Sequence, residues 1–176
     1  MTDFIKLPWL QHPHKAKQII GEAPANPGDI SASFIFAFKG EEILMAQVYS
    51  RGWELPGGHR ENAETSEEAV SRELFEECGT SAIMMGELGH LEITLDGDKP
   101  PQPYPYPFPT SYLMFYWGIV DHVGAPSSSM EVGEPKFFNE KDARKLDSIK
   151  NNIFFYEDAL QRAKIVAEKM AQLDSS

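Results

Sequence analysis

One stretch, residues 65–79, limits the fold more than any other because both ends of a helix can be read from it. Thr65 is a favourable N-cap residue, and Glu68 three positions later completes a capping box. Gly79 stands where a left-handed residue commonly ends a helix. We therefore predict a helix from Ser66 to Cys78. Four side chains are spaced to face a core: Ala69, Val70, Leu74 and Cys78.

The predicted helix also carries three glutamates, Glu73, Glu76 and Glu77, at spacing i, i+3 and i+4. They share one face, where like charges destabilise a helix by roughly 0.2–0.5 kcal/mol per pair. A hard divalent cation such as Mg²⁺ prefers carboxylate oxygens, so the cluster is typical of a metal site. A solvated acidic face is the alternative, and the three glutamates by themselves favour it.

The residues around this acidic face decide between the two interpretations. Seven positions stand at fixed distances along residues 58–79: Gly58, Glu64, Arg72, Glu73, Glu76, Glu77 and Gly79. A chance match at a given start is on the order of one in 10⁸ at ordinary residue usage. The spacing resembles the signature of the Nudix hydrolases. The last signature position prefers an aliphatic residue and holds Thr80 here, which concerns packing rather than chemistry.

The resemblance implies an α+β chain with the Nudix fold, an α/β/α sandwich in which a mixed β-sheet lies between helices. We expect a single domain over residues 1–176. It would include an N-terminal arm at 1–28, a Pro-rich loop at 98–110 and a C-terminal helix at 150–174.

Residue patterns predict the elements of the sheet independently of the resemblance. Aromatic and β-branched runs predict strands at 31–38, 43–49, 53–55, 85–95, 112–122 and 136–138. A short helix is expected at 141–146, and helical spacing is clearest over 156–173. Strands mixed with few helices favour a mixed sheet with helices on its faces.

The resemblance also assigns roles within the signature. It implies that Glu73, Glu76 and Glu77 are the metal ligands, often joined by the backbone carbonyl of Gly57. Glu64 and Arg72 would form the supporting pair that pins the loop to the helix. The implied cofactor is Mg²⁺, with Mn²⁺ as an alternative, and the metal would activate water against a diphosphate.

The general base is open among several glutamates. Glu73 is our first choice, but members of the family do not all use the same base, so other glutamates stay open. Glu134, or another late-loop glutamate such as Glu131, is the alternative. Either of these two could equally be a solvated loop residue.

The run Arg51 to Pro56 resembles the segment that precedes the signature in MutT-like members. Trp53 could shape a base pocket, although an aromatic residue in a short strand is more often core. Arg51 could reach a phosphate or be solvated. Glu134 is the third substrate-binding candidate. His59, after the two glycines, could contact a phosphate but is expected to line the loop.

These residues favour a nucleoside di- or triphosphate as substrate, with an oxidised purine nucleotide resembling 8-oxo-dGTP as first choice. Nucleotide sugars, ADP-ribose and dinucleoside polyphosphates compete within the same enzyme class. A ligand sensor with the same fold and no turnover is the alternative from another class. The intact glutamates speak against it.

The segment 100–109 is the least generic part of the chain, because prolines alternate there with Tyr104, Tyr106 and Phe108. Proline removes backbone donors, so an extended polyproline-type loop is expected. The loop could be a rigid structural element, present aromatic rings to a substrate base, or pack in a homodimer. Binding a proline-recognition domain is the least expected role in a compact enzyme.

Charge and cysteine content limit the partners and the compartment. The net charge of −11 argues against a nucleic-acid-binding protein, which needs a basic face. The single cysteine, Cys78, excludes an internal disulfide and favours a reducing, cytoplasmic location. The first ten residues do not resemble a signal peptide, and no run of about 18 apolar residues predicts a membrane span.

Overall fold

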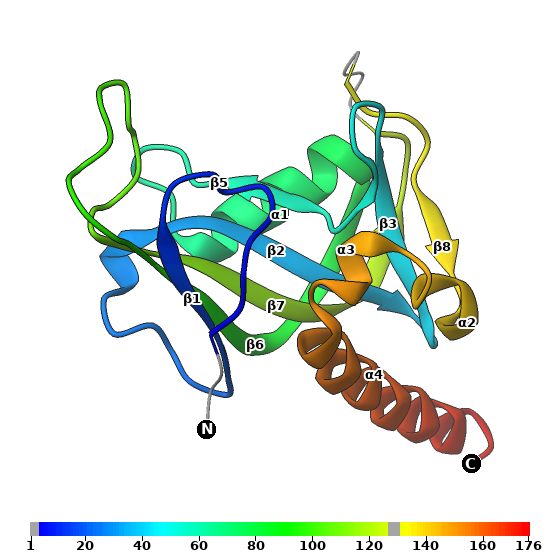
Figure 1. Cartoon of the computed structure of the whole chain (residues 1–176). Helices are drawn as coiled ribbons and strands as arrows, with labels where there is room; N and C mark the ends of the chain where they lie inside the picture. The colour runs from blue at the N-terminus through cyan, green and yellow to red at the C-terminus, as the bar shows by residue number, and fades with distance from the viewer. Residues whose placement is uncertain (1–3, 127–130) are drawn as a thin grey trace.

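A mixed β-sheet runs through the molecule (Figure 1). The computed structural model describes residues 4–126 and 131–176, except for the side chains of residues 84 and 85. In these residues the sheet has eight strands in the order β1-β6-β7-β2-β3-β4, with β5 paired to β2 and β8 to β3. The strands are β1 (His14–Ile20), β2 (Ile30–Lys39), β3 (Glu42–Val48), β4 (Gly52–Glu54), β5 (Gly57–His59), β6 (Thr80–Leu95), β7 (Thr110–Val123) and β8 (Lys136–Phe138). The central β2–β7 pair is parallel, whereas the other pairs are antiparallel.

The helix α1 (Ser66–Cys78) has the predicted bounds because both of its caps form. The Thr65 hydroxyl accepts a hydrogen bond from the Glu68 amide (3.1 Å), and the Glu68 carboxylate accepts one from the Thr65 amide (2.8 Å). Gly79 ends the helix in the left-handed conformation with φ 60°. The four side chains expected to face inward are all buried.

Helices cover both faces of the sheet, as the alternation of side chains along β2 requires. Ile35 and Ala37 point to the face that packs against Val70, Leu74 and Cys78 of α1. Phe36 and Phe38 point to the opposite face, which α4 (Ile153–Asp174) covers with Phe155, Tyr156, Ala159, Leu160 and Ala163. The predicted sandwich with a mixed sheet between helices is confirmed (Figure 1).

Two parts of the sheet differ from the prediction. The expected arm at 1–28 contains β1, an edge strand whose residues pair with β6 from His14↔Leu95 to Ile20↔Gly89. Only Ala16 of β1 is fully buried, so its sequence shows little hydrophobic alternation. The strand β6 begins at Thr80 rather than at residue 85. Its first half was not predicted, because three register shifts interrupt the alternation of side chains there.

Smaller differences concern short elements. Gly57 and Gly58, expected in a loop, lie in β5 and pair with β2. The helix expected at 141–146 is replaced by α2 (Glu140–Ala143) and α3 (Asp147–Lys150), which are separated because Leu146 adopts an extended conformation (ψ 135°). A 3-10 turn, η1 (Pro27–Asp29), precedes β2.

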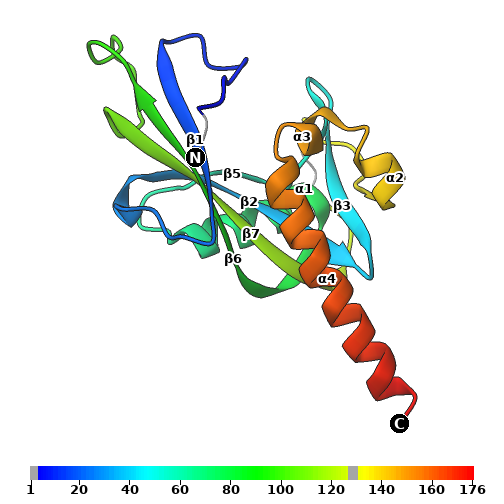
Figure 2. The same ribbon diagram turned by 60° about the horizontal axis from the view of Figure 1, so that its bottom comes forward.

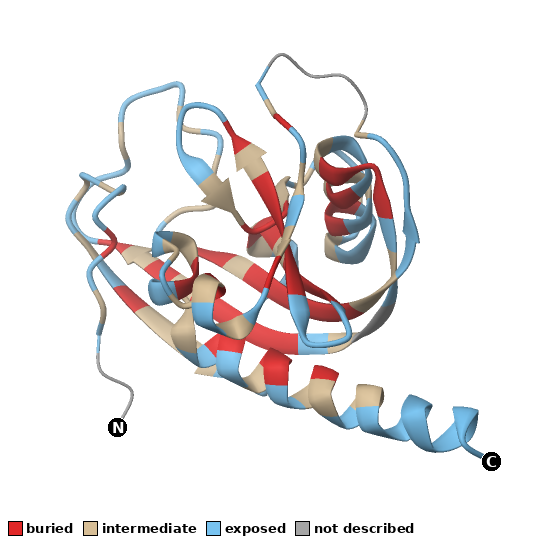
Figure 3. Ribbon diagram, turned by 90° about the vertical axis from the view of Figure 1, so that its right-hand side faces the viewer, coloured by how far each residue is buried: buried red, intermediate tan, exposed pale blue. Residues whose placement is uncertain are grey.

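The C-terminal helix starts at Ile153, three residues later than expected, and extends beyond the sheet (Figure 2). Its buried residues all lie in its first half (Figure 3), whereas Met170 and Leu173 near its end are exposed. Within the described ranges, no helix is both long and apolar enough to cross a membrane.

Candidate active site

Two glycines bring the strand β5 into contact with both β2 and α1. Gly57 has φ 150°, and a Cβ atom there would lie 2.2 Å from the carbonyl oxygen of Ser33. A Cβ atom on Gly58 would lie 2.7 Å from Glu73 Oε1. Larger residues would therefore push β5 away from the sheet or displace the Glu73 carboxylate.

Arg72 joins the loop to the acidic face of α1. Its Nε and Nη2 atoms donate to the two carboxylate oxygens of Glu64 (2.7 and 3.2 Å). Nη2 also donates to the backbone oxygen of His59 (3.1 Å). Nη1 donates to Glu73 Oε1 (3.0 Å) and to Glu76 Oε2 (3.2 Å). One guanidinium group thus fixes the loop and two of the three candidate ligands.

The Glu64 carboxylate is held in the charged form. The hydrogen bond from Arg72, supported by one from the Glu61 amide, lowers the pKa of Glu64. The structure therefore brings together the two residues expected to form the supporting pair.

Glu77 faces inward and has an unusual proton affinity. Its Oε2 atom accepts a hydrogen bond from the Gly57 amide (3.1 Å). Burial, together with repulsion from Glu73 and Glu76, raises the pKa of Glu77 from 4.5 to about 7. Arg51 acts in the opposite direction and lowers this pKa, so the exposed arginine lies within electrostatic reach of the acidic face.

The donor set fits a hard divalent cation, although the carboxylates do not converge. Glu73 and Glu76 are turned toward Arg72, and Glu77 toward Gly57. In the part of the chain that the structure describes, no three His, Cys, Asp or Glu side chains meet at metal-ligand spacing. Oxygen ligands suit Mg²⁺, and a cation beside Glu77 would offset the repulsion that raises its pKa.

Trp53, a substrate-binding candidate, lies in the edge strand β4 and is partly buried against the hydrophobic core. Its ring packs edge-on against Phe138 at a centroid distance of 5.1 Å, and Ser148 donates a hydrogen bond to its backbone oxygen (2.8 Å). These contacts account for its partial burial without a substrate.

Glu131 and Glu134, the alternative bases, are exposed on the segment that leads into β8. This segment is anchored to β3, because Val132 forms a bridge with Val48. Both glutamates thus lie on a segment beside β3 and not on α1. Both roles therefore stay predictions.

Cys78 contributes to the core behind the site. It is fully buried, and this burial raises the pKa of its thiol to about 12. A thiol with this pKa stays protonated near neutral pH, so Cys78 serves the packing of the core.

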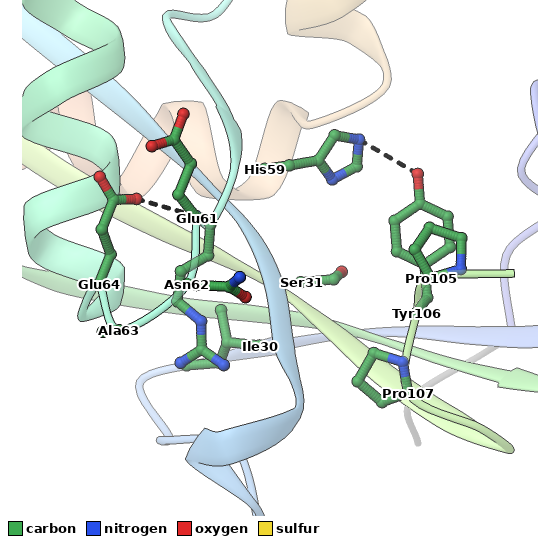
Figure 4. A pocket seen from close by; sticks show the side chains of 11 residues that line it. Ile30, Ser31, His59, Glu61, Asn62, Ala63, Glu64, Pro105, Tyr106 and Pro107 are labelled. Atoms are coloured by element: carbon green, nitrogen blue, oxygen red, sulfur yellow. Dashed lines mark hydrogen bonds between the residues drawn. The ribbon is translucent and has the colours of Figure 1, made fainter.

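A cleft of about 650 Å³ is lined by Glu64, the partner of Arg72 (Figure 4). The loop from His59 to Glu64 forms one wall and Pro105–Pro107 the other, with Ile30 and Ser31 between them. The Tyr106 hydroxyl lies 3.3 Å from His59 Nε2, and the two rings are 5.2 Å apart. The sequence singled out both residues but not their contact, because 47 positions separate them.

Known proteins match this chain by family and by fold. The NUDIX domain model matches residues 29–157. No curated protein sequence matches the chain. Among solved structures, the pyrophosphohydrolase BsRppH of Bacillus subtilis is 18% identical, with a TM-score of 0.66, and the match covers 85% of this chain and 92% of that one.

Two further structures have the same fold. A NUDIX hydrolase from Nitrosomonas europaea has a TM-score of 0.56 at 18% identity, with 73% of this chain and 89% of that one covered. An ADP-ribose pyrophosphatase from Streptococcus suis has a TM-score of 0.53 at 18% identity, with coverage of 76% and 90%. Because the family model spans most of the chain and the sheet has the same fold, this protein belongs to the Nudix hydrolases, enzymes that act on acid anhydrides.

Proposed function

We propose that the chain cleaves the diphosphate linkage of a nucleoside di- or triphosphate-type substrate and depends on Mg²⁺. The observation that carries this proposal is the acidic face of α1, where Arg72 holds Glu73 and Glu76 beside the partly buried Glu77. A carboxyl group whose pKa is raised by burial and by neighbouring carboxylates is typical of a functional site, and oxygen ligands are those that Mg²⁺ prefers.

Glu73, Glu76 and Glu77, with the carbonyl of Gly57, would hold the metal. When bound, Mg²⁺ neutralises phosphate oxygens and lowers the pKa of water. Glu73 would take the proton from the attacking water, with Glu134 or Glu131 as the alternative base. Arg72 and Glu64 would be positioning residues, because their hydrogen bonds hold the signature loop and the Glu73 carboxylate in place. Arg51 would contact a substrate phosphate.

Within the family, the residues before the signature favour a purine nucleotide as substrate. An oxidised purine nucleotide such as 8-oxo-dGTP would use Trp53, whose ring packs against Phe138. The similar structure from Streptococcus suis is that of an ADP-ribose pyrophosphatase, which supports including nucleotides that bear a second sugar. Dinucleoside polyphosphates are the remaining alternative substrates. The sequence predicts a cytoplasmic location, and packing in a homodimer is one of the alternatives for the Pro-rich loop.

A hydrolysis screen, in which the nucleotide products are separated by ion-exchange chromatography, tests this function directly. Purified protein is incubated with oxidised and ordinary nucleoside triphosphates, nucleotide sugars, ADP-ribose and dinucleoside polyphosphates. Each reaction is run with Mg²⁺, with Mn²⁺ and with a chelator. We expect turnover of at least one diphosphate only when metal is present. Binding of nucleotides without turnover across the panel would contradict the proposal and favour a ligand sensor.

A further inference from the structure

The cleft between the Pro-rich loop and the signature loop adjoins the acidic face, with the Arg72 side chain between the two. Glu64 lines the cleft, and its carboxylate is bonded to Arg72, which also contacts Glu73 and Glu76. The backbone oxygen of His59, another lining residue, accepts from the same guanidinium group. A substrate with its diphosphate over the acidic face would therefore extend one end into the cleft.

The walls of the cleft are rich in hydrogen-bonding groups. Ser31, Asn62 and Tyr106 offer hydroxyl and amide groups, and His59 offers a ring nitrogen. The Ser31 hydroxyl donates to the backbone oxygen of Tyr112 (3.3 Å), so its oxygen is left as an acceptor. Groups that both donate and accept match alcohol hydroxyls, which do the same. The volume of about 650 Å³ is ample for one sugar ring.

Charge in the cleft disfavours a phosphate as its occupant. Glu61 and Glu64 carry negative charge on one wall. Arg60 is the positively charged residue among the described residues that line the cleft, and its Nη2 atom donates to the backbone oxygen of Gly28 (2.9 Å). A second phosphate group there would face two carboxylates.

The aromatic residues disfavour a planar base. Among the described residues that line the cleft, His59 and Tyr106 are the ones with aromatic rings. Their rings contact each other at a centroid distance of 5.2 Å with an interplanar angle of 33°, so no gap between them could take a base. Pro105, Pro107 and Ile30 supply the apolar surface.

We propose that this cleft binds a neutral, hydroxyl-rich group, of the sugar class, attached to the far side of the scissile diphosphate. Tyr106 and His59 are its specificity-determining residues, and the Pro-rich loop serves to hold Tyr106 opposite the signature loop. This inference rests on the proposed function and deepens it, because it selects sugar-bearing diphosphates among the competing substrates. Tyr106 acts on the choice of substrate and not on the reacting atoms.

Matched substrate pairs test the proposal with the full chain and Mg²⁺. UDP-glucose is compared with the methyl ester of UDP at its terminal phosphate, and ADP-ribose with the corresponding methyl ester of ADP, because each pair keeps the charge of the diphosphate and differs in the far sugar. We expect wild-type kcat/KM to be higher for the sugar-bearing member. Tyr106→Phe and Asn62→Ala should each lower kcat/KM about 2- to 10-fold for that member, as loss of one hydrogen bond predicts, and leave the other unchanged.

The control variant is Tyr104→Phe, which removes a hydroxyl two residues away in the same loop. Tyr104 packs edge-on against Tyr106 (5.4 Å) but does not line the cleft, so the substrate preference should persist. Equal kcat/KM within each pair, or equal losses on both members in Tyr106→Phe, would overturn the cleft assignment while leaving diphosphate hydrolysis intact.

A binding measurement separates this inference from the proposed function. Saturation-transfer NMR with UDP-glucose reports which ligand protons touch the protein, whether or not turnover occurs. Strong saturation of the glucose protons in wild type, reduced in Tyr106→Phe, supports the cleft even if no substrate is cleaved. Absence of saturation on the glucose protons would overturn the assignment.

Discussion

At the scale of single residues, Glu77 shows a conflict between folding and chemistry. A carboxylate in a largely buried position is costly to ionise, and Glu73 and Glu76 increase this cost. The Gly57 amide compensates only in part, since the pKa of Glu77 still rises to about 7. The residue is therefore unfavourable for the metal-free fold at neutral pH and suited to a cation.

This conflict predicts how stability depends on pH without metal. Because the folded-state pKa of Glu77 is raised, its contribution to stability is fully present below pH 4.5 and is lost as pH rises through about 7. Glu77→Gln removes the titration. At pH 8 with a chelator, the variant should exceed wild type by on the order of 2 kcal/mol in free energy of unfolding. At pH 5 the two should nearly match.

Urea denaturation at the two pH values measures this difference. Glu67→Gln is the matched control, because Glu67 is an exposed glutamate on the same helix. The control should show the same difference from wild type at both pH values. A Glu77→Gln difference that is independent of pH would refute the prediction.

At the scale of elements, the sequence could predict those that are determined by nearby residues and not those that depend on pairing with distant strands. The bounds of α1 were correct because Thr65, Glu68 and Gly79 lie within the helix or beside it. The strand β1 was missed because pairing with β6 holds it, rather than a hydrophobic face of its own.

In the candidate site, too, contacts between nearby residues could be predicted and contacts between distant residues could not. The Glu64–Arg72 pair follows from a spacing that lies within one short stretch. The Tyr106–His59 contact depends on how the Pro-rich loop crosses the sheet, which no local pattern encodes. Alternation of aromatic residues with prolines was the one local signal.

Because β5 contacts both α1 and β2, we expect alanine substitutions of two adjacent glycines to affect turnover and stability differently. Gly58→Ala places a methyl group against the flexible end of Glu73, so we expect stability within about 1 kcal/mol of wild type. Diphosphate turnover should fall roughly 10- to 100-fold, as when an outer metal-site group is lost. Gly57→Ala meets the backbone of Ser33 and Phe34 instead and should lose stability strongly.

Thermal unfolding together with steady-state turnover distinguishes the two variants. Equal stability losses in both would mean that Gly58 serves the fold rather than the Glu73 carboxylate. Wild-type turnover in Gly58→Ala would contradict the proposed position of that carboxylate.

At the scale of the whole molecule, the sheet depends on a helix over each face. Phe155 of α4 is fully buried and stacks on Phe115 of β7 at a centroid distance of 4.4 Å. Its neighbour Phe154 is 60% exposed. Burial on this face therefore depends on the first turns of α4, and the exposed last turns contribute little.

This asymmetry predicts different costs for adjacent residues. Phe155→Ala should lower the free energy of unfolding by about 3–5 kcal/mol, because it leaves a cavity in the core. Phe154→Ala should change it by about 0.5 kcal/mol or less. Chemical denaturation provides the comparison, and similar losses in the two variants would contradict the packing of α4 described above.

The central claim is that the acidic face of α1 binds the metal that makes the chain a hydrolase. The most direct measurement is steady-state turnover of Glu76→Gln and Glu77→Gln on the best diphosphate substrate at saturating Mg²⁺. Glu67→Gln is the control for loss of one charge on the same helix. We predict folded variants with turnover at least about 100-fold below wild type and a control near wild type. Turnover of Glu76→Gln or Glu77→Gln within about two-fold of wild type would contradict the claim, since one charge-stabilising group is worth far more.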